Sequence, residues 1–193
     1  MAQRLILPIN ECRVTAGYKN ELYKKAWGFP HYGVDYHTGA ATPTIWGLGD
    51  GEVAAAGFDS LFGGTVVVVY PAVLVHWDGV VRDLVARCFH MKSIAVKAGQ
   101  RVTKDTRLGI MGNTGHYKFD PHLHIEFDND ILRPCHVPGL AKDGNIIKRG
   151  MDTTIDPSGV LHVKVSAPDS QQIVNRGYAG WNKEADWRLP VVR

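Results

Sequence analysis

The most constraining stretch of this 193-residue chain is Thr65-Val-Val-Val-Val-Tyr70, in which every residue before the tyrosine is β-branched. Such side chains favour extended backbone, and the absence of polar alternation indicates a strand that is buried on both faces. Val80 to His90 and His122 to Phe127 predict two further strands. Because 21 glycines and 10 prolines favour tight turns, we expect a mainly β fold: a single antiparallel sheet domain with few short helices.

The composition changes along the chain and suggests where this domain ends. Residues 1–165 carry the strand patterns and are expected to form the domain, with the polar, glycine- and proline-containing residues 128–152 as an insertion loop. Residues 166–193 form a polar C-terminal extension that nevertheless contains the aromatic residues Tyr178, Trp181 and Trp187. Aromatic rings need a surface to lie on, so we expect the extension to fold back over an edge of the sheet.

Charge and hydropathy exclude several classes of protein. A net charge of +3 suits an anionic surface such as a bacterial wall, but it falls short of a nucleic-acid footprint. No stretch approaches the roughly 18 apolar residues of a membrane span. The apolar start of the chain is broken by Pro8 and is too short for a signal-peptide core, so we expect no export signal. Three irregularly spaced cysteines (Cys12, Cys88 and Cys135) are expected to be reduced and structural.

The sharpest chemical feature is the sequence His122-Leu123-His124. On a strand the two imidazoles point to the same side, about 6.6 Å apart, and can converge on one small ion or one substrate. Two solvated histidines on an exposed face would produce the same pattern. The spacing alone therefore leaves both readings open.

Two weaker features gain weight beside it. His31-Tyr-Gly-Val-Asp35 would put a histidine and a carboxylate on one face of an extended segment, with a glycine leaving room between them, and both side chains are zinc ligands. His90 ends an apolar strand, where a lone histidine is more often structural. Two histidines and one carboxylate would leave a zinc ion with an open fourth position, and further histidines could then move protons.

In this arrangement the sequence resembles the lysostaphin-like (LytM-type) zinc endopeptidases. That family shows an HxGxD motif, a mid-chain histidine after a strand, and a late HxH motif after a loop that contains Thr-Gly. Here these elements are His31 to Asp35, His90, and Gly112-Asn-Thr-Gly115 leading to Pro121-His-Leu-His124. The resemblance runs from about Thr15 to Leu161, roughly three quarters of the chain.

The resemblance implies a role for each motif residue. It implies one zinc ion per chain, in a groove across the sheet, with His31, Asp35 and His124 as ligands. His122 and His90 are then the catalytic residues. Spacing does not choose between His122 and His124, so this assignment comes from the resemblance alone. The other histidines match no motif position and are interpreted as surface or structural residues: His37, His76, His116, His136 and His162.

The sequence also departs from the family pattern at three places. The tyrosine two residues before the mid-chain histidine is Cys88 here, and the glycine-like position before Pro121 is Asp120. A tyrosine upstream of the HxGxD motif, which is thought to help stabilise the transition state in relatives, is replaced at the equivalent spacing by Lys25. Tyr23 is a possible substitute.

These observations predict a zinc-dependent endopeptidase that hydrolyses peptide bonds in the cross-links or stems of bacterial peptidoglycan. The chief alternative is a non-catalytic relative that binds the wall or activates another hydrolase, which is expected to have lost ligands. A zinc hydrolase of a non-peptide substrate is a third reading. Without an export signal, a phage or prophage lysin made in the cytoplasm and released onto the wall is expected, or an extracellular enzyme if a leader has been removed.

Overall fold

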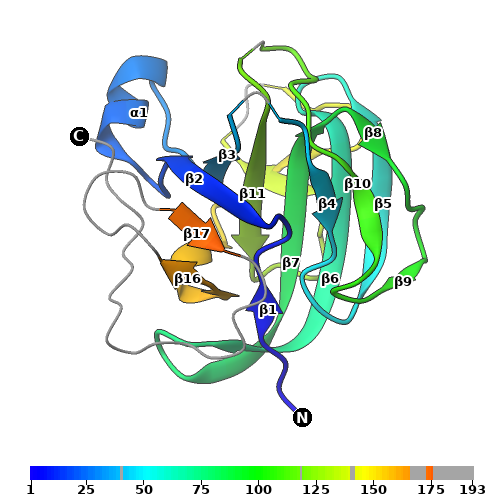
Figure 1. Ribbon diagram of the computed structural model, residues 1–193. Coiled ribbons are helices and arrows are strands. Elements are labelled where there is room, and N and C mark those ends of the chain that lie inside the picture. Colours follow the sequence, from blue (N-terminus) through cyan, green and yellow to red (C-terminus); the bar gives the residue numbers. More distant parts are fainter. Residues whose placement is uncertain (40, 118, 140–141, 166–172, 176–193) are drawn as a thin grey trace.

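The computed structural model describes residues 1–39, 41–117, 119–139, 142–165 and 173–175. A large twisted β-sheet dominates it, and a smaller sheet lies against one face (Figure 1). The helix α1 (Glu21–Trp27) lies beside one edge, and Pro157–Gly159 forms a short 3-10 helix. In the part of the chain that the structure describes, no helix is long and apolar enough to cross a membrane.

The large sheet has the strand order β16-β17-β2-β3-β11-β7-β6-β5-β9, with β14 also paired to β11. Its strands are β2 (Glu11–Ala16), β3 (Val34–His37), β5 (Gly51–Asp59), β6 (Gly63–Val75), β7 (Val80–Met91), β9 (Arg101–Val102), β11 (His122–Asp128), β14 (Thr154–Ile155), β16 (Lys164–Val165) and β17 (Ile173–Asn175). All these pairings are antiparallel. The predicted mainly β, antiparallel fold is therefore confirmed, with the Thr65–Tyr70 and His122–Phe127 strands in one sheet.

Three smaller sheets complete the structure. β4 (Thr44–Trp46), β10 (Arg107–Ile110) and β8 (Ser93–Ile94) form an antiparallel sheet in the order β4-β10-β8. Two short pairs are parallel: β1 (Leu5–Ile6) with β15 (Leu161–His162), and β12 (His136–Pro138) with β13 (Lys148–Gly150).

The main hydrophobic core joins one face of the large sheet to the small β4-β10-β8 sheet. Its members from these two sheets include Val66, Val68, Tyr70, Leu123, Ile125, Phe127, Ile45 and Leu108. All of them are at most 2% exposed, and burying each such side chain contributes about 1.5–3 kcal/mol. This core fixes which face of β11 is left for the polar residues of that strand.

A second core covers part of the opposite face of the large sheet. Val67, Val85 and Phe89 from β6 and β7 pack there against Val137 and Ile147. Val137 and Ile147 belong to the 128–152 segment, so the expected insertion loop has a packing role. The segment also contains the two short paired strands β12 and β13. The Thr65–Tyr70 strand is buried on both faces, as its composition predicts.

Hydrogen bonds of the Asp59 carboxylate connect the 128–152 segment to the turn between β5 and β6. Its Oδ1 accepts hydrogen bonds from the backbone N–H groups of Leu61 (2.8 Å) and Phe62 (3.1 Å). Its Oδ2 accepts from those of Ile146 (2.9 Å) and Ile147 (3.0 Å). Burial alone would raise the pKa of this carboxyl group, but the four N–H donors lower it below the usual value.

A β-bulge changes the direction of His90 at the end of β7. Gly64 pairs with Met91 and Val66 pairs with Cys88, so β7 has one residue more than β6 in this interval. His90 occupies the extra position with a φ of 63°, in the left-handed region. Strict alternation along β7 would put His90 on the same face as the buried Cys88. The bulge instead turns it to the face of Phe89 and the polar side of β11.

The described part of the C-terminal extension continues the large sheet. β17 pairs with β2, with Ile173 opposite Arg13 and Asn175 opposite Glu11. Tyr178, Trp181 and Trp187 lie outside the described residues, so their expected contacts with the sheet stay a prediction. The boundary between 165 and 166 also stays a prediction. None of the three cysteines forms a disulfide, and Cys12 and Cys88 are buried.

Asp59→Asn should lower the free energy of unfolding at pH 7 by about 1.5–3 kcal/mol, because hydrogen bonds to a charged acceptor are lost. The pKa of Asp59 is depressed in the folded state, so its contribution is present above the unfolded pKa of about 3.9. That contribution is lost as the pH falls through the lower folded pKa.

Urea unfolding at pH 7 and at stepwise lower pH measures this difference. The deficit of Asp59→Asn should shrink below about pH 4. Asp105→Asn removes an exposed carboxylate that pairs with Lys104 on the surface and should cost almost nothing. An Asp59→Asn protein as stable as the parent at pH 7 would contradict the role of this carboxylate.

Candidate active site

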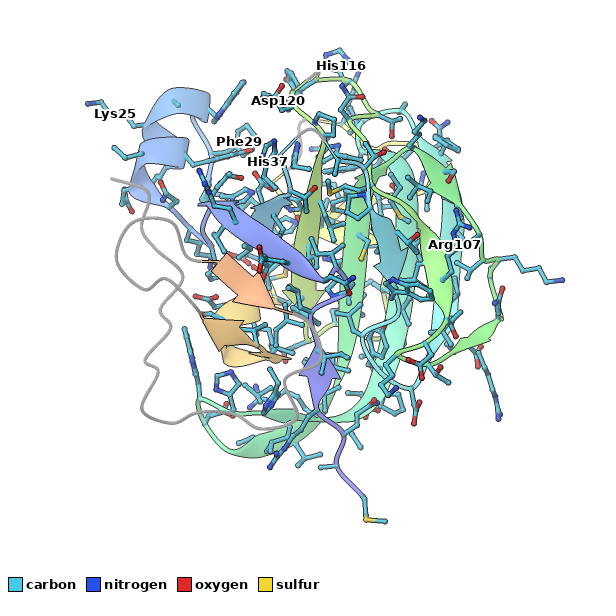
Figure 2. All side chains as sticks on the ribbon, in the orientation of Figure 1. Lys25, Phe29, His37, Arg107, His116 and Asp120 are labelled. Carbon is cyan, nitrogen blue, oxygen red and sulfur yellow. The ribbon has the colours of Figure 1, made fainter. Side chains whose placement is uncertain are left out.

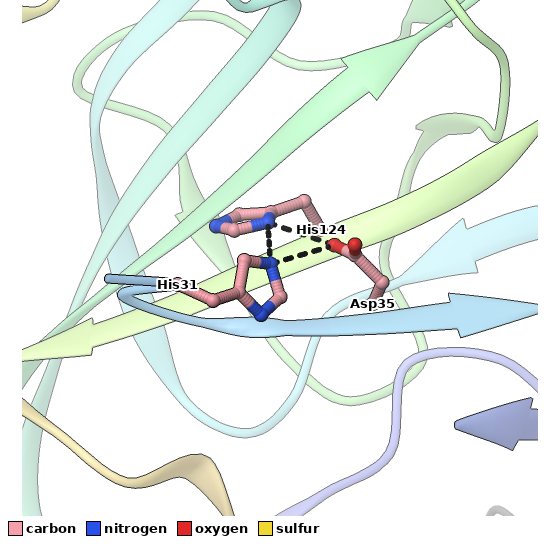
Figure 3. A group of neighbouring side chains, drawn as sticks. All are labelled: His31, Asp35 and His124. Atoms are coloured by element: carbon pink, nitrogen blue, oxygen red, sulfur yellow. Dashed lines mark hydrogen bonds and ion pairs between the residues drawn. The ribbon is translucent and has the colours of Figure 1, made fainter. Parts of the chain in front are cut away.

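Three side chains from the HxGxD and HxH motifs meet on the polar face of the large sheet. His31 precedes β3, Asp35 lies on β3, and His124 lies on β11 directly opposite Asp35. Asp35 Oδ1 lies 3.2 Å from His31 Nε2 and 2.8 Å from His124 Nδ1 (Figure 3). The two ring nitrogens are 3.0 Å apart. Among the described residues, this is the one group of at least three His, Cys, Asp or Glu side chains that could hold a metal ion.

Gly33 makes this convergence possible. A Cβ atom at this position would lie 2.3 Å from the Ile125 carbonyl oxygen and 2.6 Å from His124 Nε2. Any larger residue would push β3 away from β11 or displace the His124 ring. The glycine of the HxGxD motif is therefore needed for close approach of two strands.

A backbone carbonyl and an aromatic ring contact the His31 side chain and fix its orientation. It is 2% exposed, and its Nδ1 lies 2.9 Å from the Gly17 carbonyl oxygen. A carbonyl can only accept, so Nδ1 donates to it, and Nε2 is the ring nitrogen that faces Asp35. The ring of Tyr23 stacks on that of His31 with 4.3 Å between centroids.

The helix α1 explains why Tyr23 reaches the site and Lys25 does not. Asn20 caps the helix by accepting from the Tyr23 N–H at 3.0 Å, and Gly28 ends it with a φ of 82°. The face that carries Tyr23 turns toward His31, whereas Lys25 is exposed and points away from the sheet (Figure 2). Tyr23, the possible substitute named from the sequence, therefore lies beside His31, whereas Lys25 does not.

His90 and His122 lie side by side at the edge of this cluster. Their ring centroids are 4.8 Å apart, and His122 Nε2 lies 3.9 Å from Asp35 Oδ1. His90 Nδ1 lies 2.9 Å from the Thr114 carbonyl oxygen, and His122 Nδ1 lies 2.8 Å from that of Asp120. Each ring therefore donates through Nδ1, and its neutral form has the lone pair on Nε2. Burial, reinforced by His122 and His124, lowers the pKa of His90 to about 4.

The loop before β11 is fixed to the His90 bulge by Thr114. Its hydroxyl donates to the Met91 carbonyl at 2.7 Å and accepts from the Gly64 N–H at 2.8 Å. Gly115 follows with a φ of 119°, and a Cβ there would lie 2.7 Å from the Leu61 carbonyl oxygen. The Thr-Gly pair of this loop thus holds the bulge that orients His90.

A buried ionic cluster lies next to His124, and the sequence motifs do not predict it. His124 Nε2 lies 3.4 Å from Glu126 Oε1, and Glu126 Oε2 accepts from Arg87 Nη1 at 3.1 Å. Arg87 is fully buried and also donates to Asp128 Oδ2 at 2.8 Å and to the Pro134 carbonyl at 2.7 Å. Side chains alternate along β11, so Glu126 and Asp128 lie on the same face as His124. This alternation is the sequence pattern that could have predicted the cluster.

The electrostatics of the centre favour a carboxylate surrounded by positive charge. Burial would raise the pKa of Asp35, but His31 and His124 hold it well below the usual value. Burial would lower the pKa of His124, but Asp35 and Glu126 raise it to about 9. The centre therefore attracts a proton or another cation to the space between its three donor atoms.

An open pocket of about 350 Å³ lies over this centre and is lined by His31, His90 and His124 among others. One wall is aromatic and consists of Tyr23, Trp27, Phe29, Tyr117 and Phe119. The last four rings are 41–55% exposed. Val137, Pro138, Gly139 and Lys142 of the 128–152 segment also line the pocket.

Of the five histidines outside the motifs, His116 also lines the pocket, in the loop that carries Tyr117 and Phe119 (Figure 2). It is exposed, as expected for a surface residue. His162 is 2% exposed and packs against His76, with 5.3 Å between ring centroids. His37 and His136 are partly exposed on β3 and β12.

Known proteins of similar sequence and structure include several peptidases. The peptidoglycan DD-endopeptidase ShyC of Vibrio cholerae is 31% identical over 97 residues, which cover 50% of this chain and 20% of that protein. A zinc-containing peptidase from Vibrio cholerae superposes with a TM-score of 0.53 at 24% identity, over 65% of this chain and 37% of that one. The catalytic domain of lysostaphin from Staphylococcus simulans superposes with a TM-score of 0.51 at 24% identity, over 76% and 90%.

These likenesses differ in what they establish. At 24% identity the two solved structures show a shared fold. The chain spans between a fifth and a third of the length of the first curated relatives that it matches. The model of peptidase family M23 matches residues 29–134, which is just over half of the 193 residues and includes all five motif residues. The chain therefore belongs to peptidase family M23.

Proposed function

We propose that this chain is a zinc-dependent endopeptidase that hydrolyses peptide bonds in the cross-links or stems of bacterial peptidoglycan. One observation carries the proposal: His31 Nε2, Asp35 Oδ1 and His124 Nδ1 converge within 3.2 Å of one another in a largely buried place. Because two ring nitrogens and a carboxylate oxygen face the same point, a cation is needed between them.

The donor set suits zinc. Two imidazole nitrogens and one carboxylate oxygen are a usual set for a catalytic zinc ion, which leaves one coordination position open. Backbone contacts already orient His31 through Gly17, so the ring does not have to reorganise on binding. When bound there, one zinc ion supplies Lewis acidity to a water molecule and to the substrate carbonyl.

His122 and His90 are the proposed proton-handling residues. In the neutral form of each ring Nε2 carries the lone pair, because the Asp120 and Thr114 carbonyls fix a proton on Nδ1. A neutral imidazole in this state can take a proton at Nε2 and return it to a leaving amine. It can also, once protonated, stabilise negative charge that develops on the carbonyl oxygen.

A peptide substrate is supported by the pocket and by the relatives. The aromatic wall and the 128–152 segment bound an open trough that can accept an extended chain. The similar protein ShyC is named a peptidoglycan DD-endopeptidase, and the net charge of +3 suits an anionic wall. A non-catalytic relative is expected to have lost ligand residues. In this chain all five motif residues are present: His31, Asp35, His90, His122 and His124.

The route to the wall is a further part of the proposal. A phage or prophage lysin, made in the cytoplasm and released onto the wall, stays our prediction for the origin of this chain. An extracellular enzyme with a removed leader is the alternative.

Replacing any one of His31, Asp35 and His124 by Ala should lower the affinity for zinc by more than about 100-fold, because loss of a ligand exceeds loss of a supporting contact. Elemental analysis after dialysis against a weak chelator measures this. His37→Ala is the matched control, since His37 lies on β3 two residues from Asp35 and should keep the metal. Full zinc occupancy in His124→Ala would refute the ligand assignment.

His122→Ala and His90→Asn should each keep zinc but lower kcat by about 10² to 10⁴-fold, the usual contribution of a general acid–base group. Asn is chosen at position 90 because it tolerates the positive φ of 63°. The double variant should lose less than the product of the two single losses if both residues act on one step.

Rates of release of cross-linked fragments from purified walls, measured by mass spectrometry, test this pair. A zinc-free His122→Ala protein would mean that the roles of His122 and His124 have to be exchanged. Walls left intact by the zinc-loaded parent protein would overturn the proposed substrate.

A further inference from the structure

The four histidines of the site do not present the same nitrogen to the centre. His31, His90 and His122 each donate Nδ1–H to a backbone carbonyl and present Nε2. His124 is reversed: its Nδ1 faces Asp35 Oδ1 at 2.8 Å and His31 Nε2 at 3.0 Å. A different group must therefore fix the tautomer of this ring.

Glu126 contacts Nε2, the ring nitrogen of His124 that faces away from Asp35. The buried Nε2 atom has no hydrogen bond among the described residues, and its ionic contact is Glu126 Oε1 at 3.4 Å. Glu126 follows His124 by two residues on β11, so both side chains leave the same face of the strand. At 3.4 Å this contact is longer than a usual N–H···O hydrogen bond of about 2.9 Å, so the inference requires the contact to shorten when a cation occupies the centre.

Arg87 holds Glu126 in this position. Its Nη1 donates to Glu126 Oε2 at 3.1 Å, which leaves Oε1 directed at His124. Arg87 itself is immobilised by Asp128 at 2.8 Å and by the Pro134 carbonyl at 2.7 Å, and it is 0% exposed. Because Arg87 offsets the charge of Glu126, the carboxylate can remain buried beside the metal centre.

We propose that Glu126 is a positioning residue for the zinc ligand His124: it accepts a hydrogen bond from Nε2–H and thereby keeps the lone pair on Nδ1, directed at the metal. A ring with the other tautomer would present an N–H group to the cation and could not bind it. A carboxylate behind the ring also makes the ligand nitrogen more basic than a carbonyl does. The inference rests on the proposed function, since it concerns the same metal.

Asp128 provides a matched control for this role. It lies two residues further along β11, on the same face, is similarly buried, and pairs with the same arginine. Asp128 Oδ1 bonds to the Asp130 N–H and the Thr153 hydroxyl, and no contact joins it to His124. Asp128→Asn therefore removes an equal charge from Arg87 without touching the ligand.

The test compares the zinc dissociation constants of the parent, Glu126→Gln, Glu126→Met and Asp128→Asn proteins by competition with a chromophoric chelator. Glu126→Met should weaken zinc binding by about 10- to 100-fold. Glu126→Gln should be intermediate, because its amide oxygen still accepts from Nε2–H but lacks the charge. Asp128→Asn should bind zinc as the parent does, because the new amide oxygen and the Pro134 carbonyl can still accept from Arg87 and keep it in place. This holds even if the melting temperature of the zinc-free protein falls.

Other outcomes separate the explanations. Equal weakening by Glu126→Met and Asp128→Asn, with equal loss of melting temperature, would show that Glu126 acts only through the fold and would overturn the inference. Unchanged zinc affinity with a raised KM would overturn it in favour of direct substrate contact, since Glu126 also lines the pocket.

A second variant and the parent protein serve as controls for this test. If Glu126→Met does not fold, Glu126→Gln is compared with Asp128→Asn, and the visible spectrum of the Co²⁺-loaded proteins reports changed coordination in the first alone. A parent protein that binds no zinc would refute the proposed function itself. A parent that binds zinc and cleaves walls, beside an unaffected Glu126→Met, would refute only the positioning role.

Discussion

The convergence of three donor atoms between β3 and β11 is the constraint on which the site depends. Asp35 and His124 are paired residues of neighbouring antiparallel strands, and Gly33 lets those strands approach closely enough for Oδ1 and Nδ1 to lie 2.8 Å apart. The apolar face of β11 fixes this register, because a slip by one residue would turn the histidines into the core. The core therefore determines the geometry of the proposed metal centre as well as the stability of the fold.

Much of this could be predicted from local patterns. The β-branched run Thr65–Tyr70 predicts its strand because composition and burial agree there, and the alternation of His122, Leu123 and His124 predicts which side chains share a face. The five motif residues lie close together in the structure, whereas their roles stay a proposal. What spacing could not decide was the choice within the HxH pair. Cross-strand register supports the proposed choice of His124, which is the partner of Asp35, whereas His122 Nε2 is 3.9 Å from the carboxylate.

Other features depend on long-range contacts that no local pattern records. His90 reaches the site only because a bulge with a positive φ interrupts the alternation of β7, and Thr114 from a distant loop holds that bulge. Arg87 sits in an apolar strand that gives no sign of its partners, Glu126 and Asp128, some 40 residues away. In the same way the 128–152 segment, which looks like a loop, is organised by Asp59 and by a second core.

The central claim is that one cation binds between His31, Asp35 and His124, and anomalous X-ray diffraction from zinc-loaded crystals tests it most directly. Data collected on both sides of the zinc absorption edge locate the metal without reference to activity. The account predicts one strong anomalous peak per chain, within bonding distance of His31 Nε2, Asp35 Oδ1 and His124 Nδ1. A peak bound by His90 and His122 instead, or none at this centre, would contradict it.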